Sequence, residues 1–251
     1  MKNDVNLVPN QILRFEFPQL PDSLETMATG NKKPPQLTAQ LPENYTVTGQ
    51  FPLLVNLSGG PGGLGDHLDP ARQVAGPRDF VCANLPLFKR SLDPTELFGG
   101  LILSMEDFDG LSHAYRTMLR TLFDAVPNLT PERSALGGFS NGAHATSILL
   151  AGYDDFILEH FRSFYLVEGG LGPICANGLV KPKIMRSRFL FLQGDQPPES
   201  PERIAADFFR RGLELTSGML RIDAKFVIMK GHGHDFPSEY TAMIAPWALG
   251  K

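Results

Sequence analysis

The chain has 251 residues, of which 42% are hydrophobic and 20% are charged, and its net charge is −4. This composition excludes a disordered or coiled-coil chain, and the mild acidity argues against nucleic-acid binding, which ordinarily needs a basic face. No stretch reaches the roughly 18 apolar residues of a membrane span, and the first residues lack the apolar core of a signal peptide. We therefore expect a cytoplasmic protein without a membrane partner.

Short apolar runs alternate with amphipathic stretches along the chain. The runs 13–17 and 36–41 are predicted strands, separated by an exposed turn at 31–35. Further strands are predicted at 51–57, 79–85, 133–138, 161–167, 188–193 and 220–229. Helices are predicted at 104–126, 143–151, from Ser200 onward, and at 240–249, the last interrupted by Pro246.

This alternation predicts a single α/β domain over residues 1–251, with residues 1–35 as its N-terminal edge strand and turn. The sheet should be mostly parallel, with helices on both faces and an antiparallel N-terminal edge. Only about 20 residues separate the strands at 161–167 and 188–193, which is too few for a large cap domain.

The strongest chemical signal is the sequence Gly138-Phe139-Ser140-Asn141-Gly142, between a predicted strand and a predicted helix. Its G-x-S-x-G spacing is typical of a sharp turn that lifts a serine hydroxyl clear of a sheet. Ser140 is therefore the candidate nucleophile. The alternative is a glycine-rich turn that merely needs a small residue.

A glycine cluster at 58–63, Ser-Gly-Gly-Pro-Gly-Gly, directly follows the predicted strand 51–57. Backbone amides aimed at a developing oxyanion lower the barrier to acyl transfer, and we expect such donors at Gly60, or its neighbour Gly59, and at Asn141. Residues 60–65 also match the dinucleotide fingerprint G-x-G-x-x-G. No clean apolar helix opens at Gly65, so we expect no nucleotide cofactor.

Two histidines, His232 and His234, follow the last predicted strand. A serine hydroxyl needs a general base, and histidine titrates in the right range. We favour His234 as the base because it ends the Gly-x-Gly-His arrangement close to the closing helix. A metal site at His232, His234 and Asp235 is the alternative, but it lacks a further cluster of ligands, so we expect no metal and no other cofactor.

The acid that orients the histidine should follow a strand between Ser140 and His234. Asp195 is our first candidate because it comes just after the strand at 188–193 and Gly194. Glu168, at the end of the preceding strand, and Glu199, four residues beyond Asp195, remain open alternatives.

With these motifs, the chain resembles α/β-hydrolase-fold serine esterases, in particular the branch of esterases similar to polyhydroxybutyrate depolymerases. The resemblance lies in Pro52-Leu53-Leu54-Val55-Asn56-Leu57-Ser58-Gly59-Gly60-Pro61-Gly62 and in the serine turn, and it covers about residues 36–249. It implies the order nucleophile, acid, histidine. The chain departs from the pattern at Ser58, where a histidine is usual, and at Pro197, which stands at the usual place of the acid.

We therefore expect a serine hydrolase that cleaves a small-molecule carboxylic ester through an acyl-enzyme on Ser140. Two alternatives remain open. One is a serine peptidase or acyltransferase of the same fold, and the other is a non-catalytic binding protein that keeps the fold. Neither the acyl and alcohol groups nor the oligomeric state follow from the sequence.

Overall fold

The computed structural model describes residues 7–20, 25–26, 34–60, 63, 65–89, 104–177 and 179–251. Most of the turn expected at 31–35 lies outside these residues, as do Pro61 and Gly62 of the glycine cluster.

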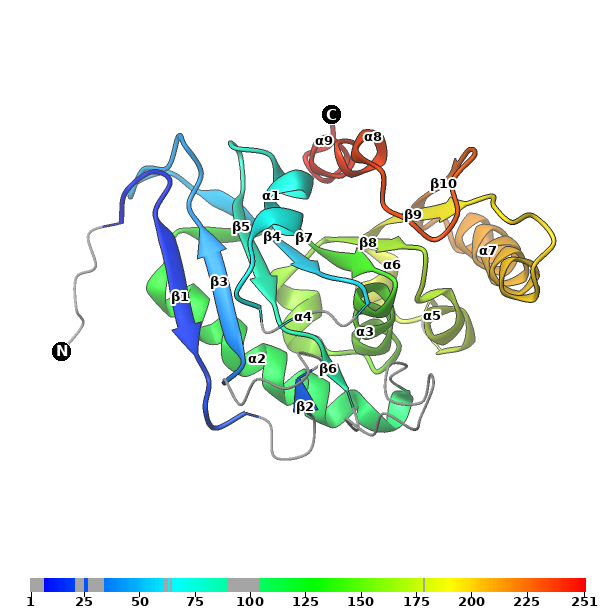
Figure 1. The fold of residues 1–251 in the computed structure, drawn as a ribbon, viewed down its shortest axis with the longest axis horizontal. Coiled ribbons are helices and arrows are strands. Elements are labelled where there is room, and N and C mark those ends of the chain that lie inside the picture. Colours follow the sequence, from blue (N-terminus) through cyan, green and yellow to red (C-terminus); the bar gives the residue numbers. More distant parts are fainter. Residues whose placement is uncertain are drawn as a thin grey trace.

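An eight-stranded sheet runs through the molecule in the order β1-β3-β5-β4-β7-β8-β9-β10 (Figure 1). The pairs from β5 to β10 are parallel, whereas β3 pairs antiparallel with both β5 and β1. This arrangement confirms the predicted mostly parallel sheet with an antiparallel N-terminal edge. The strands are β1 Ile12–Glu16, β3 Gln36–Gln40, β4 Phe51–Leu57, β5 Val81–Leu85, β7 Leu129–Phe139, β8 Ser163–Val167, β9 Arg188–Gly194 and β10 Asp223–Met229, with β2 Glu25–Thr26 and β6 Phe88–Lys89 paired separately.

Helices cover both faces of the sheet, as predicted (Figure 1). One apolar cluster contains Met118 of α2, Ile148 of α3 and Leu213 of α7. The cluster on the other face contains Val74 of α1 and Trp247 of α9. The helices are α1 Asp69–Ala75, the 3₁₀ turn η1 Met105–Asp107, α2 Phe108–Ala125, α3 Asn141–Ala151, α4 Asp155–His160, α5 Leu171–Asn177, α6 Pro182–Met185, α7 Pro201–Leu220, α8 Ser238–Thr241 and α9 Ile244–Ala248.

The structure differs from the sequence-based elements in a few places. In place of the closing helix predicted at 240–249 there are two short helices, α8 and α9, and Pro246 lies in the first turn of α9. Helix α1 was not predicted, because Leu68 at its N-cap makes no side-chain capping bond. Between β8 and β9 the described residues form only the short helices α5 and α6, which agrees with the expected lack of a large cap.

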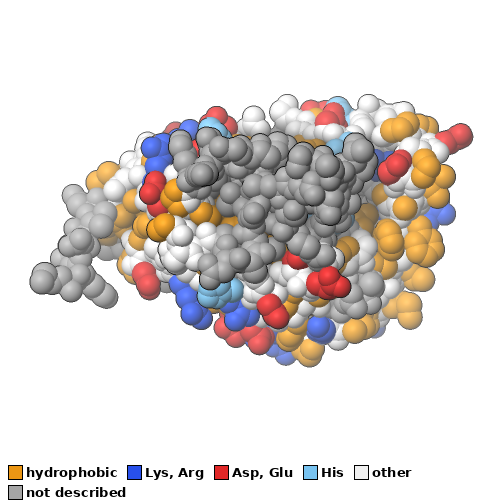
Figure 2. All heavy atoms as spheres, turned by 60° about the horizontal axis from the view of Figure 1, so that its bottom comes forward, with side chains coloured by type: hydrophobic (Ala, Val, Ile, Leu, Met, Phe, Trp, Pro, Cys, Tyr) orange, Lys and Arg blue, Asp and Glu red, His pale blue; other side chains and the backbone are white. Residues whose placement is uncertain are grey.

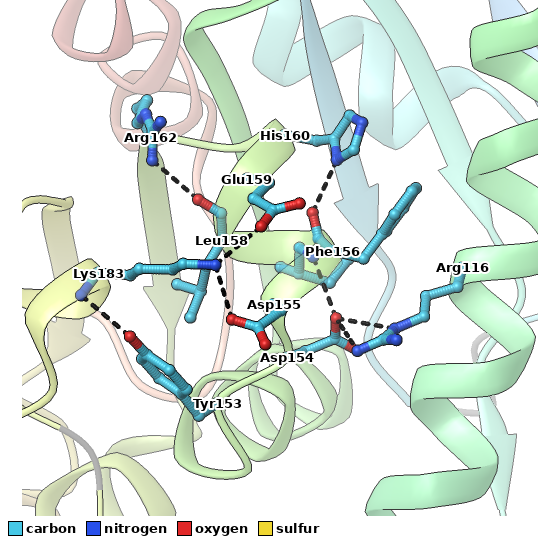
Figure 3. A network of polar contacts seen from close by, with 11 residues as sticks. Arg116, Tyr153, Asp154, Asp155, Phe156, Leu158, Glu159, His160, Arg162 and Lys183 are labelled. Carbon is cyan, nitrogen blue, oxygen red and sulfur yellow. Dashed lines mark hydrogen bonds and ion pairs between the residues drawn. The ribbon is translucent and has the colours of Figure 1, made fainter.

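The start of α4 is fixed by a buried aspartate (Figure 3). Asp154 is fully buried; its Oδ1 accepts from the Ile157 amide at 3.1 Å and lies 2.9 Å from Arg116 Nη2 of α2. Lys183 of α6 lies 2.7 Å from Asp155 and 2.9 Å from Glu159. These contacts tie α2, α4 and α6 together near the amino ends of β8 and β9, at the end of the sheet opposite the candidate site. None of the helices in the described ranges is long and apolar enough to cross a bilayer.

Candidate active site

The candidate residues gather at the carboxyl ends of the parallel strands, where open α/β sheets commonly bind ligands. The glycine cluster follows β4, Ser140 follows β7, and the loop with both candidate histidines follows β10. Because β4, β7, β8, β9 and β10 are consecutive in the sheet, these loops lie next to one another.

Ser140 occupies the turn between β7 and α3 with φ 53° and ψ −114°. This conformation is rare for a residue with a Cβ, and such strain is concentrated at functional sites. The turn packs very close to the end of β4. A Cβ on Gly138 or on Gly142 would collide with the carbonyl oxygen of Leu57. The glycines on either side of the serine are therefore required by close packing of strand and helix.

His234 lies against Ser140, as the sequence analysis expected. Its Nε2 is 2.8 Å from Ser140 Oγ. The imidazole lies over Phe139, with ring centroids 5.0 Å apart, and Phe139 in turn stacks on Phe236 at 5.9 Å. The side chain of His234 is 59% exposed, so a substrate can reach it from solvent.

Glu168 lies on the other side of the imidazole. Its Oε2 is 3.4 Å from His234 Nδ1, although its side chain is only 4% exposed. The amide of Gly194, at the end of β9, donates a hydrogen bond to Oε1. Arg203 of α7 donates from Nη2 to Oε2 at 3.1 Å, and its side chain is also buried. Two neighbouring groups thus hold the carboxylate against the imidazole.

Asp195, our first candidate for the acid, binds the backbone of the histidine loop in the structure, whereas Glu168 lies against the imidazole. Its Oδ1 accepts from the Gly231 amide at 2.7 Å, and its Oδ2 lies 3.6 Å from Lys230 Nζ. The hydrogen bond from Gly231, with the positive charge of Lys230, lowers the pKa of Asp195 below its ordinary value. Asp195 therefore fixes the backbone of the histidine loop at Gly231, and Glu168 is the carboxylate next to the imidazole. Glu199 is exposed.

The glycine cluster approaches the serine turn from the β4 side. A Cβ on Gly59 would collide with the Phe139 ring, and Gly60 has a positive φ of 60°. The side-chain amide of Asn141 donates to the Gly60 carbonyl at 3.3 Å. Asn141 is the first residue of α3, so its backbone amide has no acceptor within the helix.

His232 points away from the serine. Its Nδ1 lies 3.1 Å from Asp235 and its Nε2 lies 3.3 Å from Glu239. The hydrogen bond with Asp235, together with the charges of both carboxylates, raises the pKa of His232 above its ordinary value. Within the described ranges, this cluster included, His, Cys, Asp and Glu side chains form no group of three suited to a metal ion.

Among the remaining histidines, His144 lies close to His234. It lies in the first turn of α3, and its backbone amide donates to the Ser140 carbonyl at 3.0 Å. Burial, with a smaller contribution from His234, lowers the pKa of His144, so this ring stays neutral beside the nucleophile at neutral pH.

Sequence reasoning missed Arg203. The signal that could have found it is the helix start at Ser200, whose hydroxyl accepts from the Arg203 amide at 3.1 Å. This cap places residue 203 in the first turn of α7, at the same end of the sheet as the other candidates. Nothing in the sequence, however, indicates that its guanidinium turns inward to Glu168.

No protein-family model matches the chain, and no curated protein matches it. Solved structures do match. A thermostable esterase superposes with a TM-score of 0.59 at 15% identity over 95% of this chain, although the chain spans only 62% of that esterase. An esterase of Pyrobaculum calidifontis has a TM-score of 0.59 at 12% identity, covering 96% of this chain and 85% of that one. An S-formylglutathione hydrolase of Agrobacterium tumefaciens has a TM-score of 0.56 at 12% identity, covering 97% and 95%. With the sheet order described above, these matches show that the chain has the α/β-hydrolase fold.

Proposed function

We propose that this α/β-hydrolase-fold protein is a serine hydrolase that cleaves carboxylic esters through an acyl-enzyme on Ser140. The observation that carries the proposal is the continuous row of contacts from Ser140 through His234 to Glu168, at 2.8 Å and 3.4 Å. The printed descriptions of the structures that share its fold, esterases and an S-formylglutathione hydrolase, support an ester as the bond that is cleaved.

In the proposed reaction, His234 carries its proton on Nδ1, facing Glu168, so that Nε2 accepts the proton of the Ser140 hydroxyl. The freed oxygen bonds to the ester carbonyl carbon, and the carbonyl electron pair moves to its oxygen. Collapse of this intermediate expels the alcohol, which takes the proton from Nε2. Water, deprotonated by the same nitrogen, then releases the acid and restores Ser140.

The backbone amides of Gly60 and Asn141 are the proposed donors to the oxyanion. Their support is the close approach of the glycine cluster to the serine turn and the hydrogen bond between Asn141 and the Gly60 carbonyl. Each such donor contributes roughly 3 kcal/mol to transition-state stabilisation. Glu168, rather than Asp195, is the proposed acid, because Glu168 is the carboxylate next to Nδ1.

The test is covalent labelling. A fluorophosphonate probe should react with Ser140 Oγ, lose fluoride and add its mass to the intact protein. Ser140→Ala should not be labelled and should lose about 10⁶-fold in kcat on p-nitrophenyl esters. Ser238→Ala, in α8, is the matched control and should be labelled normally.

Absence of labelling on the wild-type protein would overturn the proposal and favour a non-catalytic binding protein. If the wild-type protein is labelled, a series of p-nitrophenyl esters of increasing chain length would identify the acyl group that it prefers.

A further inference from the structure

Helix α7 carries an apolar stripe that no other part of the described chain covers. Four large side chains on it are 61% to 76% exposed: Ile204, Phe208, Leu215 and Met219. The opposite side of the helix packs inward through Leu213, which is fully buried. Figure 2 shows hydrophobic side chains gathered at the end of the molecule where α7 lies in Figure 1. Contiguous exposed apolar surface of this kind marks an interaction site.

The order of residues on the stripe is symmetric. The midpoint of this stripe lies between Arg211 and Gly212. Ile204 and Met219 are equally far from it on opposite sides, and so are Phe208 and Leu215. A surface that contacts its own copy around a two-fold axis must be self-complementary in this way. With the axis at the midpoint and the helices antiparallel, Phe208 would face the partner's Leu215, and Ile204 would face the partner's Met219.

One charged residue lies on the stripe itself: Arg211, seven residues after Ile204, is exposed. Arg211, beside the axis, is long enough to extend its guanidinium to the rim while its stem stays in the contact.

Gly218 is a second sign that something approaches this face. A glycine inside a helix costs about 1 kcal/mol relative to alanine. Nothing in the described chain lies within 4 Å of the place that a Cβ on Gly218 would occupy. Packing within one chain therefore does not require a glycine at this exposed position. Its symmetric counterpart is another small exposed residue, Ala205.

We propose that two copies of this chain associate through α7, in an antiparallel pair with the two-fold axis between Arg211 and Gly212. At roughly 200 Å² for a fully exposed large side chain, the four apolar residues present roughly 500 Å² on each copy. Two copies would bury roughly 1,000 Å², the lower limit for a specific interface, before the flanking residues are counted. The pairing goes beyond the proposed function and does not rest on it.

The experiment is sedimentation equilibrium of the full chain over a range of concentrations. The wild-type protein should reach twice its 27.6 kDa mass. Phe208→Glu should weaken the dimer at least 100-fold, because two carboxylates would enter the apolar contact. Val180→Glu is the matched control, since Val180 is equally exposed but lies off α7; it should leave the dimer intact. Circular dichroism of each variant, measured in parallel, checks that the fold is retained.

The register is tested by paired charges on the stripe. Adding Leu215→Lys to Phe208→Glu in the same chain should restore part of the dimer, because position 208 would face the partner's position 215 and opposite charges would meet there. A monomer at all concentrations would overturn the proposal, as would a dimer that tolerates Phe208→Glu. Phe208-dependent binding of the monomer to phosphatidylcholine vesicles would also overturn it, because the occupant of the stripe would then be a lipid surface.

Discussion

The loops after β8 and β9 each bring one carboxylate close to the histidine loop, but they hold it in different surroundings. Glu168 is almost completely buried and is shared between the Gly194 amide, Arg203 and the imidazole of His234. Asp195 is partly exposed and binds the backbone of the histidine loop at Gly231. The first carboxylate lies against the ring, whereas the second binds the backbone of the loop that carries the ring. Two carboxylates that follow neighbouring strands are therefore suited to different tasks, because they differ in burial and in the groups that they contact.

The largest difference between the two loops should be seen in kcat. Glu168→Gln should lose roughly 10⁴-fold in kcat, because a neutral amide no longer secures the imidazole tautomer that accepts the serine proton. The matched variant Asp195→Asn should change kcat only a few-fold. The measurement is steady-state hydrolysis of p-nitrophenyl acetate, with circular dichroism to confirm folding. If Asp195→Asn were the more damaging of the two, the roles assigned to the two loops would be reversed.

The cations beside the two carboxylates should differ in their effect on stability. Arg203→Met leaves Glu168 as an unpaired buried charge, which should lower the free energy of unfolding by about 3–5 kcal/mol. Lys230→Met, opposite the exposed end of Asp195, should have no measurable effect. Arg203→Lys should retain much of the stability, because only Nη2 of the guanidinium has a partner within the described chain. Urea denaturation of the three variants checks this; equal effects of Arg203→Met and Lys230→Met would contradict it.

A smaller effect on kcat should show whether the hydrogen bond from the Gly231 amide to Asp195 is needed. Asp195→Asn keeps an oxygen that can accept from the Gly231 amide, whereas Asp195→Ala does not. We expect Asp195→Ala to lower kcat more than Asp195→Asn, with the change arising from displacement of the histidine loop. A crystal structure of Asp195→Ala should show His234 moved relative to Ser140. Identical kinetics of the two variants would show that the hydrogen bond to Gly231 is not needed.

The smallest effect concerns pH. The pKa of His232 is raised, chiefly by its hydrogen bond with Asp235, so its protonated form stabilises the folded chain. This contribution is fully present below the ordinary pKa of 6.5 and is lost as the pH rises through the higher folded value. His232→Gln should therefore lower the Tm slightly at pH 5.5 and change it less at pH 8. A larger loss at pH 8 than at pH 5.5 would show the opposite sign of linkage.

The sequence was informative wherever function depends on neighbours along the chain. The strand at 51–57 was predicted with its observed bounds, and the serine turn was placed correctly between β7 and α3, because the steric demands of a tight turn act over a few residues. The choice of His234 over His232 rested on the Gly-x-Gly-His arrangement close to the closing helix, and both Ser140 and His234 come after strands of one parallel sheet.

The acid could not be identified in the same way. Glu168 and Asp195 each follow a strand, and the choice between them depends on how the ends of three elements meet in space. In the structure the Gly194 amide, the guanidinium of Arg203 and the positive φ of 52° at Glu168 hold this carboxylate next to the imidazole. None of these has a local pattern in the sequence. The two residues after Glu168 are glycines, which permit the tight turn but do not by themselves indicate a catalytic role.

The backbone angles at the two ends of the proposed triad have a consequence for how this protein would respond to selection. Ser140 and Glu168 both have positive φ values, at which a glycine would relieve roughly 1–3 kcal/mol of strain. At Ser140 the gain is opposed by loss of the hydrogen bond with the exposed His234, which contributes only about 0.5–1.5 kcal/mol, so Ser140→Gly should give a more stable but chemically silent protein. A screen that rewards thermal resistance alone would favour such variants, whereas one that rewards ester turnover would remove them. Engineering of this chain for heat tolerance therefore has to keep activity in the selection from the first round.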